Sequence, residues 1–275
     1  MVSTKRPLLA LHILTEDSAA TAHDTLVALV KKMVLLLDPA CRTHLVAFEP
    51  QGDRERRAMH GNLWKSKRHL DQPKIILLGR AIAEKLLEQD VPGFVLFHVD
   101  GDVPWARHDE SENVAKFSGF LQTYVRQALD RALRVQHKER GDTATDEVIA
   151  TQVDAALQRL LRLTPFYSIE AWTYQNTAEA RRLCEQNCGR HVDQIKLWEN
   201  DPGALDEIDK PKDGEAAICL QDRYNLHLAT TGFPAERAFE VGKSFTETVM
   251  RLLDCKDLCS ALHQTRLDAA SASPT

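Results

Sequence analysis

The feature that most constrains the fold is a short apolar run that ends in two aspartates. Residues 94–99 are mostly apolar and β-favouring, and Asp100-Gly101-Asp102 follows directly. Residues i and i+2 of an extended segment point to the same side, so we expect both carboxylates at one strand end, about 6 to 7 Å apart. Such charges repel each other unless a cation lies between them, and hard oxygen ligands suit Mg²⁺ or Mn²⁺. The sequence therefore predicts a divalent-metal site at the carboxyl end of a buried strand.

Strand-like and helix-like segments alternate through the first half of the chain. Strand patterns cover 8–14, 44–48 and 94–99, with a possible fourth at 164–168, and helical spacing covers 19–37, 75–87, 113–136 and 147–162. This alternation is typical of βαβ units and predicts an α/β fold with a mostly parallel sheet flanked by helices. We expect an α/β domain over residues 1–178, a helical C-terminal region over 179–264 and a disordered tail over 265–275.

Length and composition favour a cytoplasmic protein. The 275 residues have room for one large or two small domains, and no run approaches the 18 apolar residues of a membrane span. We expect no signal peptide and no membrane partner. Six cysteines are too few for a secreted disulfide framework. Cys184, Cys188 and His191 have the spacing of a partial metal site, but small hydrophobic side chains on a helix face are the favoured interpretation.

A basic segment stands out against the acidic whole. The net charge is −5, which argues against a bulk nucleic-acid binder, yet residues 54–69 hold six basic residues and one acidic residue. We expect residues 50–71 to form a long loop. It could contact a phosphate backbone or be an ordinary solvated surface, and the candidate nucleic-acid contacts in it are Arg54, Arg56, Arg57, Lys65, Lys67 and Arg68.

A third acid belongs with the two aspartates. Glu16 follows the first expected strand, as Asp100 and Asp102 follow the third, and ligands of open α/β sheets collect at the carboxyl ends of strands. A strand ending in Glu, then a helix, then a hydrophobic strand ending in Asp-x-Asp resembles the Toprim domain of primases, topoisomerases and small nucleases. The resemblance implies that Asp100 and Asp102 bind metal, and that Glu16 binds metal or takes a proton from the attacking water.

Three further segments make the resemblance more particular. They are Pro165-Phe166-Tyr167-Ser168-Ile169-Glu170-Ala171-Trp172, Asp209-Lys210-Pro211-Lys212, and Ser244-Phe245 with Leu252-Leu253. Together they resemble a prokaryotic Toprim-like family with a Glu-Ala-Trp motif, often encoded beside an ABC-type ATPase in defence-like operons. This implies that Glu170 is a further acid of the site, that Lys212 contacts phosphate and that an ABC-type ATPase is the partner. His98 is expected on the opposite pleat from the acids, as a packed side chain.

The expected function is Mg²⁺- or Mn²⁺-dependent hydrolysis of phosphodiester bonds in DNA or RNA, with a homodimer possible. Two alternatives stay open. The run 99–103 also matches the haloacid-dehalogenase phosphatase signature, in which Asp100 would be the nucleophile and Asp142 and Asp146 the last acidic motif. The chain could also be a non-catalytic regulatory or docking subunit of an ATPase complex.

Overall fold

The computed structural model describes residues 9–17, 19–59, 73–88, 93–187, 189–207 and 224–271. Four strands form one parallel sheet in the order β2-β1-β3-β4, with bounds β1 Leu9–Thr15, β2 Val46–Pro50, β3 Gly93–His98 and β4 Leu160–Leu163. Every residue of the central strands β1 and β3 is buried, as expected for a parallel sheet covered on both faces. The predicted α/β fold with flanking helices is confirmed.

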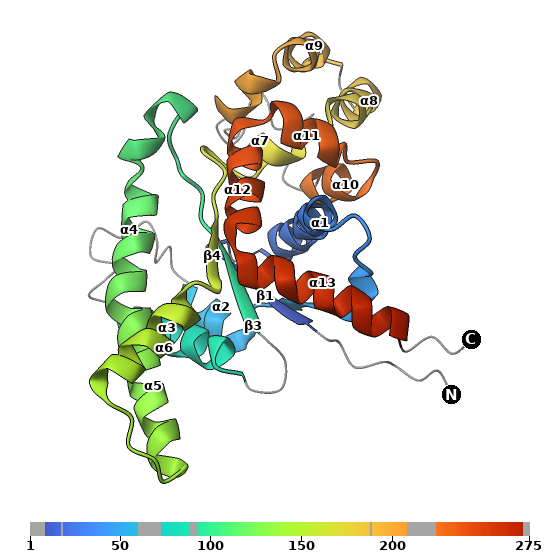
Figure 1. Ribbon diagram of the computed structural model, residues 1–275. Coiled ribbons are helices and arrows are strands. Elements are labelled where there is room, and N and C mark those ends of the chain that lie inside the picture. The colour runs from blue at the N-terminus through green and yellow to red at the C-terminus, as the bar shows by residue number, and fades with distance from the viewer. Residues whose placement is uncertain are drawn as a thin grey trace.

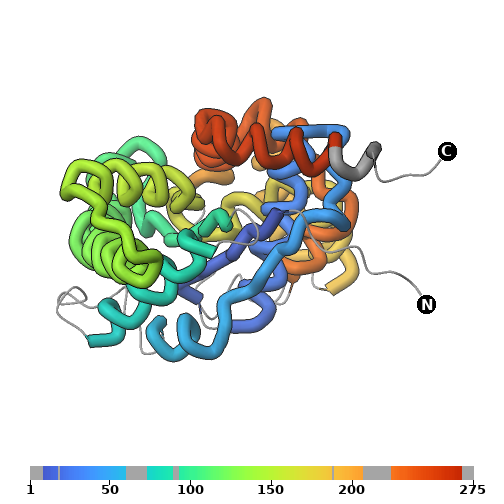
Figure 2. Tube along the Cα trace, turned by 60° about the horizontal axis from the view of Figure 1, so that its bottom comes forward, coloured from blue at the N-terminus to red at the C-terminus, as the bar shows by residue number. Residues whose placement is uncertain are grey.

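Helices cover both faces of this sheet (Figures 1 and 2). The helices that precede β4 are α1 Ala20–Leu37, α2 Asp53–Met59, α3 Pro73–Leu86, α4 Glu112–Phe120, α5 Arg126–Glu139 and α6 Asp146–Leu157. Those that follow it are α7 Glu170–Thr173, α8 Thr177–Asn187, α9 Val192–Asn200, α10 Asn225–Thr230, α11 Ala235–Val241, α12 Lys243–Asp254 and α13 Lys256–Ser271. Short turns of other helix types are η1 Thr43–Leu45, η4 Trp105–Glu110, η5 Leu121–Val125 and η6 Pro202–Glu207.

The pleat of the strands divides the core into two layers. Leu11 and Leu96 pack with α1 and with helices α10 to α13, whereas Val95 and Phe97 pack with α3 to α6. Figure 2 shows α4 to α6 on one side of the strands and the C-terminal helices on the other. The first layer joins residues from both sides of position 178 in one core. The boundary placed there stays a prediction.

Three local expectations differ from the structure. The helix expected to reach residue 162 ends at Leu157, and β4 occupies Leu160–Leu163. Periodicity does not distinguish helix from strand in a short apolar run, and here pairing with β3 makes the run a strand. Helix α2 lies inside the segment expected to be a loop. The expected tail is helical as far as Ser271, and Thr265 is buried. Among the described residues, no helix combines the length and apolar character needed to cross a bilayer.

Candidate functional site

The carboxyl ends of β1 and β3 bring Glu16 and Asp100 together. The two strands are adjacent and parallel, and Thr15 is paired with His98 at their ends. The Glu16 amide donates to the carbonyl of His98 at 3.2 Å. The Asp100 amide in turn donates to the Glu16 Oε1 atom at 2.6 Å. These two backbone contacts hold both acids at one edge of the sheet, next to each other.

This pair of carboxylates is electrostatically costly. Asp100 is only 3% exposed. Burial raises the pKa of Glu16 to about 8, and the neighbouring Asp100 charge adds to the rise. A carboxyl group with a pKa near neutrality can exchange a proton at physiological pH, which is the property required of a general acid or base.

His98 contacts this pair on the same side of the strand. Its Nε2 atom lies 3.3 Å from Asp100 Oδ1, and its Nδ1 atom lies 3.0 Å from Thr15 Oγ1. Burial acts to lower the pKa of His98, but the contact with Asp100 reverses this effect and the pKa is raised. The expectation that His98 lies on the opposite pleat from the acids is wrong, because its side chain contacts the carboxylate of Asp100.

Glu170 is the third acid near Asp100. It lies in α7, is 2% exposed, and its Oε1 atom accepts a 2.9 Å hydrogen bond from Asn225 Nδ2. Its Oε2 atom is buried and accepts no hydrogen bond within the described part of the chain. Burial raises the pKa of Glu170, and the charge of Asp100 raises it further. Asp100 therefore interacts with acids from two different elements.

Asp102 is turned away from this buried cluster. Its φ is +56°, in the left-handed region, and its side chain is exposed. The carboxylate accepts a 2.8 Å hydrogen bond from Asn113 Nδ2, which also donates to the carbonyl of Asp100 at 2.8 Å. Gly101 allows this turn, since a Cβ atom there would lie 2.4 Å from the Phe166 carbonyl oxygen. The strand ends at His98, so the argument that both aspartates project from one extended segment does not hold.

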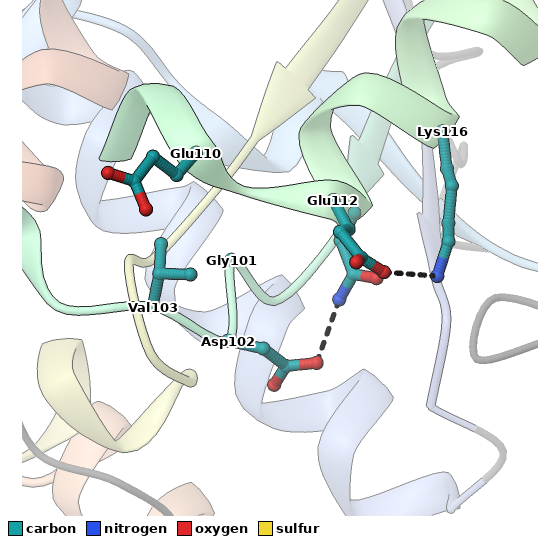
Figure 3. Close-up of a pocket in the computed structure, with 7 residues that line it drawn as sticks. Gly101, Asp102, Val103, Glu110, Glu112 and Lys116 are labelled. Atoms are coloured by element: carbon teal, nitrogen blue, oxygen red, sulfur yellow. Dashed lines mark hydrogen bonds and ion pairs between the residues drawn. The ribbon is translucent and has the colours of Figure 1, made fainter. Parts of the chain in front are cut away.

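Asp102 instead lines an open cavity of about 380 Å³ at the start of α4 (Figure 3). Figure 3 shows Asp102 in the loop that precedes α4, and Glu112 of α4 pairs with Lys116 at 3.8 Å. Ser111 Oγ donates to the carbonyl of Gly101 at 2.8 Å and accepts from the amide of Val114, which fixes the start of the helix against the loop. Within the described residues, no group of three or more His, Cys, Asp or Glu side chains is placed to hold a metal ion.

The Glu-Ala-Trp segment links the acidic site to the C-terminal helices. Trp172 packs edge-on against His98, with ring centroids 6.3 Å apart, and against Phe245 at 5.9 Å. Its Nε1 atom donates to Ser244 Oγ at 2.9 Å. Two of the sequence segments that carry the family resemblance therefore meet directly behind the site.

The remaining candidates lie elsewhere or outside the described residues. Arg54, Arg56 and Arg57 are exposed on α2, where Arg54 pairs with Glu84 at 2.5 Å and Arg56 with Asp53. Four candidates fall outside the described ranges, namely Lys65, Lys67, Arg68 and Lys212, as does Cys188. Cys184 is fully buried in an apolar cluster with Tyr174 and Trp198, as a packed side chain would be.

Sequence reasoning missed the amides and hydroxyls around the acids. Asn113, Asn225 and Thr15 each hold a site residue in place, and Lys116 lines the cavity. A signal was present for two of them. Asn113 and Lys116 lie one helical turn apart just after the Asp-x-Asp segment, so they share a face of the helix that follows the site.

Comparisons with protein-family models, with curated proteins and with solved structures found no match to this chain. The functional argument therefore rests on the residues and their geometry.

Proposed function

We propose that this protein is a Toprim-like, Mg²⁺- or Mn²⁺-dependent nuclease that hydrolyses phosphodiester bonds in DNA or RNA. One observation carries the proposal. Glu16 and Asp100 meet at the carboxyl ends of two adjacent parallel strands, with Glu170 close to Asp100. Carboxylates gathered at this edge of an α/β sheet are the common arrangement for metal-assisted phosphoryl chemistry.

The chemistry of these donors fits a hard divalent ion. Carboxylate oxygens are the preferred ligands of Mg²⁺. Burial and then the charge of Asp100 raise the pKa of Glu16, and a bound cation would favour the ionised form of both carboxyl groups. Glu16 and Asp100 would hold the ion, with Asp102 nearest the open cavity. A bound ion would activate water and offset the charge on the leaving oxygen.

The surrounding residues would orient these acids and move a proton. Glu16 Oε1 is occupied by the Asp100 amide, so Oε2 is the atom that would accept a proton from the attacking water. His98 orients Asp100 through Nε2 and is itself held by Thr15. Lys116 lines the open cavity beside Asp102 and pairs there with Glu112, so it would contact a substrate phosphate in exchange for that pair.

Two other kinds of chemistry are less well supported. Thr15, His98 and Asp100 have the order of a hydrolase triad, but Thr15 is 1% exposed, so its hydroxyl cannot reach a substrate. For the phosphatase alternative, Asp142 pairs with His137 and Asp146 with Arg134 at the α5–α6 turn. Figure 1 shows this turn at the far end of α5 from the loop that follows β3.

An ABC-type ATPase remains the proposed partner, and it would supply the restraint and recognition that an acidic nuclease needs. The rival in which the chain only docks onto such an ATPase makes a different prediction. A docking subunit keeps its partner after Asp100 is changed and cleaves nothing, whereas a nuclease loses cleavage.

Incubation with plasmid, single-stranded DNA and total RNA tests the proposal. We expect cleavage with Mn²⁺ and none with EDTA. Asp100→Asn should lower the rate about 10³-fold, since several kcal/mol of transition-state stabilisation depend on the metal. Asp109→Asn is the matched control, because Asp109 is exposed and pairs with His108. Cleavage that survives EDTA, or an Asp100→Asn variant as active as the control, would overturn the proposal.

A further inference from the structure

A second candidate binding site lies along the edge of the sheet, in the groove between α4 and α12. β4 is the edge strand, and Figure 1 shows it between these two helices. Two cavities of about 220 and 460 Å³ lie along it and share Leu161 and Arg251 in their walls. The smaller is lined chiefly by Phe117, Leu121, Leu160, Leu161, Arg162 and Arg251. Its floor is apolar, and its charged groups are two arginines.

Arg162 lacks the partner that a partly buried guanidinium normally has. Its Nε atom is buried with no hydrogen-bond acceptor, and within the described residues its side chain forms no ion pair. Other arginines do have carboxylate partners, such as Arg126 with Asp154 at 2.6 Å. A buried donor without an acceptor costs folding free energy, so its retention here points to a ligand.

Arg251 places a second positive charge beside the first. It pairs with Glu247 and donates to the backbone carbonyl of Arg162 at 3.1 Å. Burial, followed by the charge of Arg251, lowers the pKa of Arg162 to about 10, so the Arg162 guanidinium stays charged at neutral pH. Two arginines and one glutamate leave one positive charge uncompensated in this part of the groove.

We propose that Arg162 and Arg251 form a binding site for a phosphate group at the β4 edge. Guanidinium groups match the oxygens of phosphate with paired hydrogen bonds. A phosphodiester carries one negative charge, which matches the one uncompensated positive charge at the smaller cavity. The larger cavity also has Asp254, Lys256 and Asp257 in its wall, so the phosphate belongs at the smaller one. The apolar floor suits the sugar or base attached to such a phosphate, and the cavities have the size of ordinary small-ligand sites.

The site is separate from the acidic site, although α4 contributes residues to both. α4 lines both places, with Asn113 and Lys116 at the cavity beside Asp102 and with Ser118 at the groove. Phosphate binding in the groove does not require that the acids hold metal or cleave anything.

Binding in EDTA, without turnover, tests this site by itself. The probes are inorganic phosphate and a short single-stranded oligonucleotide. Calorimetry measures their affinity, and thermal melting measures the stabilisation that they produce. We expect both to bind the wild-type protein, and Arg162→Gln to weaken them about 10- to 100-fold, since hydrogen bonds between charged groups are lost. For the oligonucleotide, the slope of log binding constant against log salt concentration should become less steep by about 0.7 for each phosphate contact removed.

Three comparisons keep the result interpretable. Arg134→Gln removes the same charge from an arginine paired with Asp130 and Asp146, and should bind as wild type. Arg251→Gln and Arg162→Lys serve if Arg162→Gln fails to fold, and each should also weaken binding. Asp100→Asn should keep phosphate binding even where it abolishes cleavage, so the two proposals can fail separately.

Several outcomes would overturn the assignment. Undiminished binding by folded Arg162 and Arg251 variants would do so, as would equal weakening by Arg134→Gln, which would indicate a general charge effect. Succinate binding as tightly as phosphate, with the same dependence on Arg162, would identify a carboxylate site instead. Binding of inorganic phosphate but not the oligonucleotide would restrict the ligand to a free phosphate or small phosphate ester.

Discussion

Two regions of this molecule bury aspartates in opposite surroundings. Asp206, 1% exposed, accepts the amide of Lys243 at 2.8 Å, the amide of Ser244 at 3.0 Å and the Ser244 hydroxyl. Asp100, 3% exposed, lies against Glu16 and close to Glu170. The first carboxylate is surrounded by donors and the second has other acids beside it. Burial alone therefore does not distinguish these two aspartates, whereas their neighbours do.

Burial is the largest influence on the pKa of both Asp206 and Glu16 and raises both, but the second-largest influence has opposite signs. The hydrogen bonds from Ser244 and Lys243 counteract the rise at Asp206. At Glu16 the Asp100 charge adds to it. A fold that keeps the second arrangement gives up stability, as functional sites commonly do.

The largest expected effect is on the structural side. Asp206→Ala should lower the free energy of unfolding by about 3 kcal/mol, because it leaves the buried Ser244 groups and the start of α12 without an acceptor. Urea denaturation measures the change. Asp201→Ala is the control, since Asp201 is exposed, and it should stay within about 0.5 kcal/mol of wild type. Equal effects of the two changes would show that the hydrogen bonds of Asp206 do not stabilise the fold.

The second effect is a pH dependence that comes from Glu16. Its pKa is about 8 in the folded protein and 4.5 in a model peptide, so the folded state binds more protons between these values. Stability should then fall as pH rises, by up to about 1.4 kcal/mol per pH unit. Between pH 6 and 8 the free energy of unfolding should fall by about 2 kcal/mol less in Glu16→Gln than in wild type. Urea denaturation in EDTA measures this difference. Parallel pH profiles would show that Glu16 ionises normally.

A smaller effect, about 1 kcal/mol, should come from Glu170. Glu170→Gln keeps the acceptor for Asn225 and removes a buried charge next to Asp100, so it should stabilise the protein at pH 8 in EDTA. The gain should shrink as the pH falls, because the raised pKa of Glu170 favours its protonated form. In a double-mutant cycle, Asp100→Asn should reduce the gain. A gain that is independent of Asp100 would mean that the two acids do not interact.

The fold and the meeting of two acids could be predicted from the sequence. Continuous apolar runs at β1 and β3 indicate buried parallel strands. Once β1 and β3 are neighbours, Glu16 and Asp100 must lie at the same edge. These conclusions need only the local pattern and the alternation of strands and helices.

The rest depends on contacts between distant segments. No local pattern indicates that the Phe166 carbonyl lies where a Cβ of Gly101 would be, or that Asn225 reaches Glu170. The turn at Asp102 follows from such a contact. The prediction from spacing assumes an extended chain through Asp102, and it is wrong because nothing in the local sequence indicates this contact. The left-handed backbone of Asp102 is the feature of the site that the sequence indicates least.

The smallest expected changes in stability belong to Asp102→Gly and Asp102→Asn. Together with cleavage measurements, these variants separate a structural role of Asp102 from a chemical one. Asp102→Gly relieves the φ of +56° but loses the hydrogen bond from Asn113, and since each effect is about 1 kcal/mol, they should nearly cancel. Asp102→Ala loses the hydrogen bond without relief and should be about 1 to 2 kcal/mol less stable. Asp102→Asn keeps both the tolerated turn and the acceptor, so its stability should match wild type. If the aspartate is kept for chemistry, the Gly and Asn variants will fold normally and yet lose cleavage at least tenfold, measured with Mn²⁺ on the best substrate. Unchanged cleavage in both would place Asp102 with Asp206, as a residue that serves the fold alone.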